Sequence, residues 1–82
     1  MNTTKKPLDE LLELVTPKSL WWHTNGNQYV VLHIANVAYR HPNYPVTVVY
    51  QNYDNGTVWT RALADWERSF TLYKAGVPYA ST

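Results

Sequence analysis

The stretch that decides the fold is Val48–Leu63, which reads VVYQNYDNGTVWTRAL. Its Asn55-Gly56 pair tolerates the positive φ angles that a type I′ hairpin turn requires. β-Branched and aromatic residues on both sides of this pair favour extended strands. The stretch therefore predicts two antiparallel strands joined by a tight turn.

The length of the turn sets which residues of this hairpin share a face. With a two-residue loop, Asp54 lies opposite Thr57, and side chains alternate between the two faces from there. One face then carries the pairs Asn52 with Trp59, Tyr50 with Arg61, and Val48 with Leu63. A three-residue loop with a glycine bulge shifts the pairing by one residue and exchanges the faces.

One further strand precedes the hairpin. The Asn25-Gly26 pair is another turn signal, and residues 29–37 are rich in β-branched and aromatic side chains. Both faces of that strand are mostly apolar, which is typical of a central strand. The loop RHPNYP leads into a strand over residues 46–53, the first arm of the hairpin.

A short amphipathic helix is predicted over residues 7–16. Its apolar positions follow helical spacing, and Pro17 ends it. So short a helix is unstable alone, so its leucine stripe must pack on the domain or on a partner chain. The residues predicted for such an interface are Leu8, Leu11, Leu12 and Trp21.

The C-terminal part adds little regular structure. Residues 65–70 predict one helical turn capped by Asp65, residues 71–73 a short strand, and residues 74–82 a loose tail. The chain is thus predicted to be one mainly β, small α+β domain over residues 1–82, with its β-rich core at 21–73. Either a twisted antiparallel sheet or a small SH3-like barrel fits this pattern, with a short N-terminal helix.

Composition limits the classes of function. The 82 residues suffice for one domain, and 45% hydrophobic with 16% charged residues excludes a charge-driven disordered chain. A net charge of +1 disfavours binding to duplex DNA through its phosphates. The absence of cysteine excludes disulfides and thiolate chemistry, and acidic residues interrupt the N-terminal apolar run. A cytoplasmic protein without membrane contact is expected.

Aromatic content is the main functional clue. Four Trp, seven Tyr and one Phe are more large rings than so small a core is expected to bury. Several rings are therefore predicted to lie on a surface that meets a ligand or partner.

The chain from Trp22 to Phe70 resembles a family of short proteins from phages, prophages and bacteria. The family pattern is an aromatic residue and a His before a turn glycine, then Tyr-x-Val-Leu, Val-Val-Tyr, and Gly-x-x-Trp-x-Arg-Pro-Leu followed by an aromatic residue. The matching residues are Trp22, His23, Gly26, Tyr29, Val31, Leu32, Val48, Val49, Tyr50, Gly56, Trp59, Arg61, Leu63 and Trp66. The chain departs from the pattern at Ala62, where the family has Pro. The resemblance implies a compact β-rich domain of viral origin and assigns no activity.

Arg61, Trp59 and Tyr50 form the strongest candidate binding site. A guanidinium between two aromatic rings can stack on a planar base and pair with a phosphate or carboxylate. The alternative is that Trp59 belongs to the core and that Arg61 merely covers it. The full predicted ligand-binding set is Trp59, Arg61, Tyr50, Trp22, His23 and Asn52. By the family match Trp22 is expected to point inward, and its neighbour Trp21 outward.

Catalytic and metal chemistry find little support in the sequence. His23, His33 and His41 lack the spacing of a local metal pair; His33 is expected to be a hydrogen-bonded residue within a strand. Ser19 and Ser69 lack the flanking glycines of a nucleophile elbow, and the glycines do not form a phosphate loop. No enzyme activity, metal or cofactor is predicted.

Three functions remain open. The first is a small homo-oligomer that sequesters a nucleotide-type ligand without converting it; by analogy with other short phage proteins, this ligand would be a host immune signal. The second is a module that docks on a host protein through the leucine-striped helix. The third is the stacking of single-stranded nucleic acid on exposed rings such as Tyr53 and Trp59.

Overall fold

A computed structural model describes residues 6–38 and 41–76 of the chain. This part contains one α-helix, one 3₁₀ helix and five strands. In chain order they are α1 (Leu8–Leu14), β1 (Leu20–His23), β2 (Gln28–Ala35), β3 (Thr47–Asn52), β4 (Val58–Ala62), η1 (Leu63–Arg68) and β5 (Phe70–Lys74).

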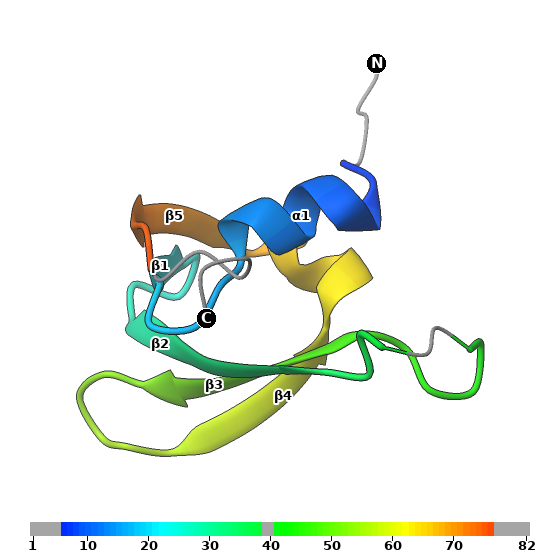
Figure 1. Ribbon diagram of the computed structural model, residues 1–82. Coiled ribbons are helices and arrows are strands. Elements are labelled where there is room, and N and C mark those ends of the chain that lie inside the picture. Colours follow the sequence, from blue (N-terminus) through cyan, green and yellow to red (C-terminus); the bar gives the residue numbers. More distant parts are fainter. Residues whose placement is uncertain (1–5, 39–40, 77–82) are drawn as a thin grey trace.

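The strands form a single open sheet in the order β4-β3-β2-β1-β5, and all neighbours are antiparallel. Figure 1 shows the sheet strongly curved, with α1 and η1 lying over its concave side. The predicted mainly β fold with a short N-terminal helix is confirmed. Of its two predicted forms, the structure has the twisted open sheet.

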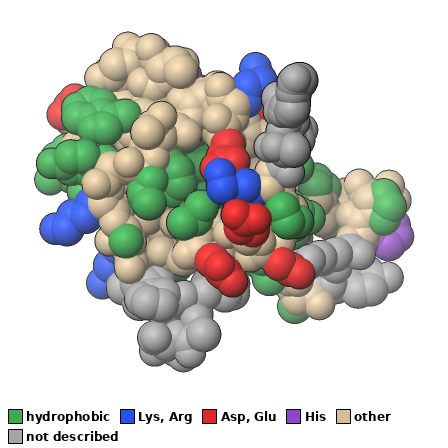
Figure 2. Space-filling model, turned by 90° about the horizontal axis from the view of Figure 1, so that it is seen from above, with side chains coloured by type: hydrophobic (Ala, Val, Ile, Leu, Met, Phe, Trp, Pro, Cys, Tyr) green, Lys and Arg blue, Asp and Glu red, His purple; other side chains and the backbone are tan. Residues whose placement is uncertain are grey.

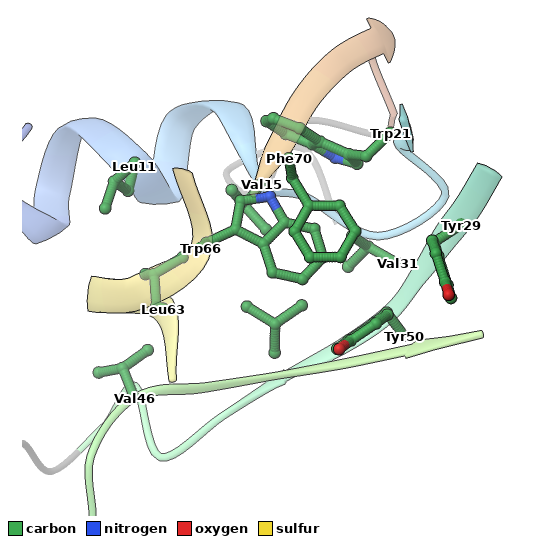
Figure 3. Close-up of a cluster of buried hydrophobic side chains, with 11 residues drawn as sticks. Leu11, Val15, Trp21, Tyr29, Val31, Val46, Tyr50, Leu63, Trp66 and Phe70 are labelled. Atoms are coloured by element: carbon green, nitrogen blue, oxygen red, sulfur yellow. The ribbon is translucent and has the colours of Figure 1, made fainter. Parts of the chain in front are cut away.

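The core lies between the concave face of the sheet and the two helices. At its centre the ring of Trp66 stacks on Phe70, and Trp21 and Tyr50 meet Trp66 edge-on. Figure 3 shows these rings together with Val15 and Leu63 in one cluster. Five aromatic side chains of the described residues are nevertheless exposed, which confirms that the core cannot bury them all: Trp22, Tyr44, Tyr53, Trp59 and Tyr73.

Helix α1 packs on its own domain. Pro7 precedes it, and its N-terminus has no side-chain cap. Leu11 and Val15 are buried in the core, while Leu8, Leu12 and Leu14 pack against that core from its margin. An ion pair of 2.8 Å between Lys6 and Glu67 joins the start of the helix to η1.

Strand β2 contains a bulge. Val31 pairs with Tyr50 and His33 with Val49, so Leu32 is an extra residue in the strand. Side chains therefore change faces within β2: Tyr29 and Val31 point into the core, and after the bulge Ile34 does so. His33 lies within the strand, as predicted, and is exposed at this point.

The β3–β4 hairpin keeps its predicted faces but not its predicted register. Tyr50 pairs with Trp59 and Val48 with Arg61, a slide of two residues from the predicted pairing. The reason is the side chain of Asn52, whose Oδ1 accepts the backbone N–H groups of Asp54 and Asn55 at 2.8 and 3.0 Å. This interaction builds a loop over residues 53–56 in place of the type I′ turn.

The two neighbouring tryptophans of β1 point opposite to the prediction. Trp21 is buried at 2% exposure, whereas Trp22 is 44% exposed. Trp21 pairs across the sheet with the buried Tyr29, and this register places both side chains on the concave face. Its indole N–H donates to Ser19 Oγ at 2.8 Å, so the buried nitrogen keeps a partner.

The turn after β4 also differs from the prediction. Helix η1 begins at Leu63, and Ala62 precedes it without a side-chain cap. Asp65 lies inside the helix, where its carboxylate accepts two hydrogen bonds of 2.8 Å from Arg68. The predicted final strand is confirmed as β5; of the predicted tail 74–82, residues 77–82 lie outside the described residues.

Candidate functional site

The turns β1–β2 and β3–β4 lie at the same end of the sheet and border an open cavity of about 370 Å³. Because both connect antiparallel neighbours, and β2 joins β3 at the opposite end, the topology brings them together. The lining consists of rings and neutral polar groups: His23, Asn25, Asn27, Tyr29, Tyr50, Asn52, Asn55, Thr57 and Trp59. We call this site the donor-rich cavity.

The β1–β2 turn is held by its own side chains. Gly26 has a φ of +90°, the conformation for which the sequence supplies glycine. Asn25 Oδ1 accepts the backbone N–H of Asn27 at 2.9 Å, and His23 Nδ1 accepts that of Asn25 at 2.9 Å. The imidazole and the amide are thereby oriented by the backbone of the turn.

The β3–β4 loop orients the tryptophan at the rim of the cavity. Trp59 Nε1 donates to Thr57 Oγ1 at 2.9 Å, and Thr57 Oγ1 donates to Asn55 Oδ1 at 2.7 Å. The indole is 52% exposed yet held by this relay. An exposed ring that is already oriented gives a stacking surface at a low entropic cost.

The asparagines present donors to the cavity. The oxygens of Asn25, Asn52 and Asn55 accept backbone N–H groups. Because a backbone N–H can only donate, the accepting atom of each side chain must be the oxygen, which leaves each NH₂ group as a donor. The same reasoning gives the neutral His23 ring a proton on Nε2, since Nδ1 accepts.

The pKa shifts of two lining residues, His23 and Tyr50, both favour the neutral form. Burial, and after it the positive charge of Arg61, lowers the pKa of His23, with the Asn25 side chain offsetting part of this shift. Burial raises the pKa of Tyr50, and Arg61 opposes that shift. None of the nine lining residues is Asp, Glu, Lys or Arg. The donor-rich cavity therefore offers hydrogen bonds without a formal charge.

Four residues of the predicted ligand-binding set lie together in this lining: Tyr50, Asn52, Trp59 and His23. The remaining two, Arg61 and Trp22, are not part of it. Trp22 lies on the opposite face of β1, where its ring meets Tyr73 edge-on with centroids 6.0 Å apart. The exposed Trp59 argues against the alternative in which this ring belongs to the core.

The guanidinium of Arg61 is held by contacts within the domain. Its Nε donates to the carbonyl of Asp65 at 3.1 Å and its Nη2 to Ser69 Oγ at 2.9 Å. The guanidinium carbon lies 5.4 Å from the centre of the Phe70 ring, and 15% of the side chain is exposed. These contacts hold Arg61 against η1 and β5, and its guanidinium also interacts with Tyr50. Arg61 therefore lies next to Tyr50 without lining the donor-rich cavity, and its predicted role in ligand binding stays a prediction.

The predicted interface residues are mostly turned inward. Leu11 and Trp21 are buried in the core, and Leu8 and Leu12 pack against it. The outward side of α1 carries acidic residues instead: Asp9, Glu10 and Glu13 are exposed. Figure 2, which looks down on this side, shows acidic side chains gathered there. The leucine stripe thus packs in cis.

Sequence reasoning missed five lining residues: Asn25, Asn27, Tyr29, Asn55 and Thr57. Asn25 and Asn55 were recognised as turn formers, and the signal for their second role was available. When four consecutive strands pair in order, the first and third turns lie at the same end of the antiparallel sheet, and the two Asn-Gly pairs form these turns.

A second cavity of about 280 Å³ is lined mainly by aliphatic and proline side chains, including Leu8, Pro42 and Pro45. It lacks a convergent set of polar groups that could orient a ligand. Over residues 6–38 and 41–76, no three His, Asp or Glu side chains gather as a metal site. No helix in the same ranges is long and apolar enough to cross a membrane.

No protein-family model, curated protein or solved structure matches the chain. A function is therefore inferred from the residues of the donor-rich cavity.

Proposed function

We propose that this protein binds a small nucleotide-type ligand in the donor-rich cavity and holds it without chemical conversion. One observation carries the proposal: the oriented, half-exposed indole of Trp59 lies beside asparagine side chains whose free ends are donors. Stacking suits the flat face of a base, and amide donors suit its carbonyl oxygens and ring nitrogens.

The size and charge of the cavity narrow the ligand further. A volume of about 370 Å³ is near the lower end for small-molecule sites, which fits one nucleoside or mononucleotide unit. The uncharged lining supplies no cation for phosphates, so the base and the sugar would provide most contacts. Binding should then depend only weakly on ionic strength.

The resemblance to phage proteins extends this proposal to a biological use. A protein that retains a nucleotide in the host cytoplasm lowers the free concentration of that nucleotide. The proposed role is the sequestration of a host nucleotide signal.

The test is calorimetric titration of the protein with adenosine, AMP, GMP and UMP, with glucose as a non-planar control. Trp59→Ala should weaken binding by about tenfold or more, since base stacking contributes about 1–3 kcal/mol. Trp22→Ala is the matched control, because it removes another exposed indole outside the cavity. Equal loss in both variants, or glucose binding as tight as nucleotide binding, would contradict the proposal. Recovery of a cleaved nucleotide after heating would contradict binding without conversion.

A second candidate function is the binding of single-stranded nucleic acid. It is favoured by two more exposed apolar side chains of the same hairpin, Tyr53 and Val58, at 62% and 57% exposure; Val58 lies on the opposite face of β4 from Trp59. Titration with a short oligonucleotide at increasing salt separates the two functions. A steep loss of affinity with salt supports the nucleic-acid function, and salt-insensitive mononucleotide binding supports the first.

A further inference from the structure

The free edge of β4 differs from the free edge of β5. Among the described residues β4 pairs only with β3 and β5 only with β1, so the sheet has two open edges. The β5 edge ends in Lys74, and its pairing with β1 is broken by a bulge between Leu20 and Trp21. Lysines and bulges are devices that protect a sheet edge from pairing with another chain.

Strand β4 has neither device. Its five residues contain no lysine or proline, and its register with β3 runs without a shift. Val58, Trp59 and Thr60 are exposed. Figure 1 shows β4 as the outermost strand, on the side of the sheet away from α1. A sheet edge without these two devices can serve as a template for strand pairing, although β4 carries one charged side chain, Arg61.

Two backbone hydrogen bonds show which groups of β4 point away from the sheet. Asn52 N–H donates to Thr57 O, and Leu63 N–H donates to Val46 O, both at 2.9 Å. In an antiparallel ladder hydrogen-bonded pairs alternate, so the odd-numbered residues of β4 bond to β3. The N–H and C=O groups of Val58 and Thr60, and the N–H of Ala62, therefore point outward.

We propose that the β4 edge pairs with the β4 edge of a second copy of this chain, antiparallel and about a two-fold axis at Thr60. Thr60 of each copy then bonds to Thr60 of the other, and the Ala62 N–H of each donates to the Val58 C=O of the other. On the concave face, Trp59 lies opposite Arg61 of the second copy.

The side chains of β4 are compatible with this self-pairing. The two-fold places a neutral ring opposite each guanidinium, so no like charges face each other across the new ladder. Threonine opposite threonine, and Val58 opposite Ala62, are favourable cross-strand pairs on the outer face. A second copy is therefore complementary in both its hydrogen-bonding groups and its charges, as a symmetric interface requires.

The test places like charges at the axis. Thr60→Lys and Thr60→Glu each put two equal charges in direct opposition, and the outward Thr60 N–H has no role in the β3–β4 ladder. Analytical ultracentrifugation should show a concentration-dependent dimer for the unmodified protein and a monomer for each variant. An equimolar mixture of the two variants should form a heterodimer, because the introduced ammonium of one copy would then face the introduced carboxylate of the other. Thr71→Lys, on the exposed β5 edge, is the matched control and should leave the dimer intact.

A second measurement needs no variant. Amide hydrogen exchange at Thr60 should slow as the protein concentration rises, while exchange at loop amides outside the proposed interface, such as that of Asp54, should not change. A protein that stays monomeric up to about 1 mM would overturn the proposal. So would a dimer that persists in both charge variants, or a mixture of the two variants that stays monomeric.

Discussion

The ring of Trp66 lies flat on the ring of Phe70, with centroids 3.9 Å apart and planes 5° from parallel. The two residues belong to η1 and β5, so this contact joins the 3₁₀ helix to the last strand. Tyr50 and Trp21 surround the stack at centroid distances of 5.0 and 5.6 Å from Trp66. The stack is the centre of the core and the first place to test its stability.

Trp66→Ala should lower the free energy of unfolding by about 3–5 kcal/mol, because it removes a fully buried ring and leaves a cavity. A domain of this size has a total stability of about 5–15 kcal/mol, so the variant should be at the limit of folding. Denaturant unfolding followed by fluorescence or circular dichroism gives the value. Tyr73→Ala, at a residue that is 60% exposed, should change the stability little. A similar loss in both variants would contradict the central position of Trp66.

Arg61→Lys should lower the free energy of unfolding by about 1–3 kcal/mol. Lysine cannot reproduce the forked hydrogen bonds to the Asp65 carbonyl and Ser69 hydroxyl, or the packing over Phe70. Arg68→Lys is the matched control, since Arg68 pairs with Asp65 at the surface and should leave the unfolding transition almost unchanged. If Arg61→Lys leaves the stability unchanged but abolishes nucleotide binding, the guanidinium has the predicted ligand role and not the structural one.

Lowering the pH should destabilise the protein through His23. Burial, followed by the charge of Arg61, lowers the pKa of His23 from the usual 6.5. Below that value the unfolded chain binds a proton that the folded protein resists, so stability is full above pH 6.5 and falls as the pH drops toward the folded pKa. Protonation also removes the Nδ1 acceptor of the Asn25 N–H.

Thermal unfolding at several pH values checks this prediction. His23→Phe should flatten the decline, because phenylalanine can keep an edge contact with Phe70 without titrating. His33→Gln, at an exposed position, should keep the decline of the unmodified protein. An unchanged decline in His23→Phe would assign the effect to another group.

Gly76→Ala should destabilise the protein by about 1–3 kcal/mol through overpacking. A Cβ atom at Gly76 would overlap the carbonyl oxygen of Pro17 and the amide nitrogen of Ser19, which are backbone atoms and cannot rotate away. Gly26→Ala is the comparison, because a Cβ there meets open space and the cost comes from a φ of +90°. Gly26→Asn should recover part of that cost, since asparagine tolerates this conformation, whereas Gly76→Asn should recover none. Differential scanning calorimetry of the four variants tests both statements.

Local patterns predicted strands β2 to β5, the helix and the faces of the hairpin, because alternation and helical spacing are properties of short segments. Strand β1 was not predicted. The register of the β3–β4 hairpin could not be predicted from the Asn55-Gly56 pair. The hydrogen bonds that Asn52 Oδ1 accepts compete with the tight turn, and their strength depends on the burial of Asn52 in the folded domain. The orientation of Trp21 against Trp22 depends in the same way on cross-strand partners.

The candidate site was predicted in part. Tyr50 and Trp59 share a face because side chains alternate along a strand, and a register shift of two residues leaves every side chain on its original face. The role of Arg61 depends on η1 and β5, which lie outside the hairpin, so no pattern within Val48–Leu63 could reveal it. Asn25 and Asn55 were assigned to turn geometry alone, although a side chain whose oxygen accepts a hydrogen bond in the turn still has an amino group for a ligand.

The extra residue in β2 has a consequence for changes in chain length. A strict alternation from Val31 would place His33 in the apolar core, and Leu32 prevents this by separating the two halves of the strand. Deleting Leu32 would keep the partner of every other residue in β2 and remove the local bend. Deleting a neighbour such as Val30 would instead exchange the core-facing and solvent-facing side chains in one half of the strand. Position 32 is thus where this strand can shorten during evolution without exchanging its interior and exterior.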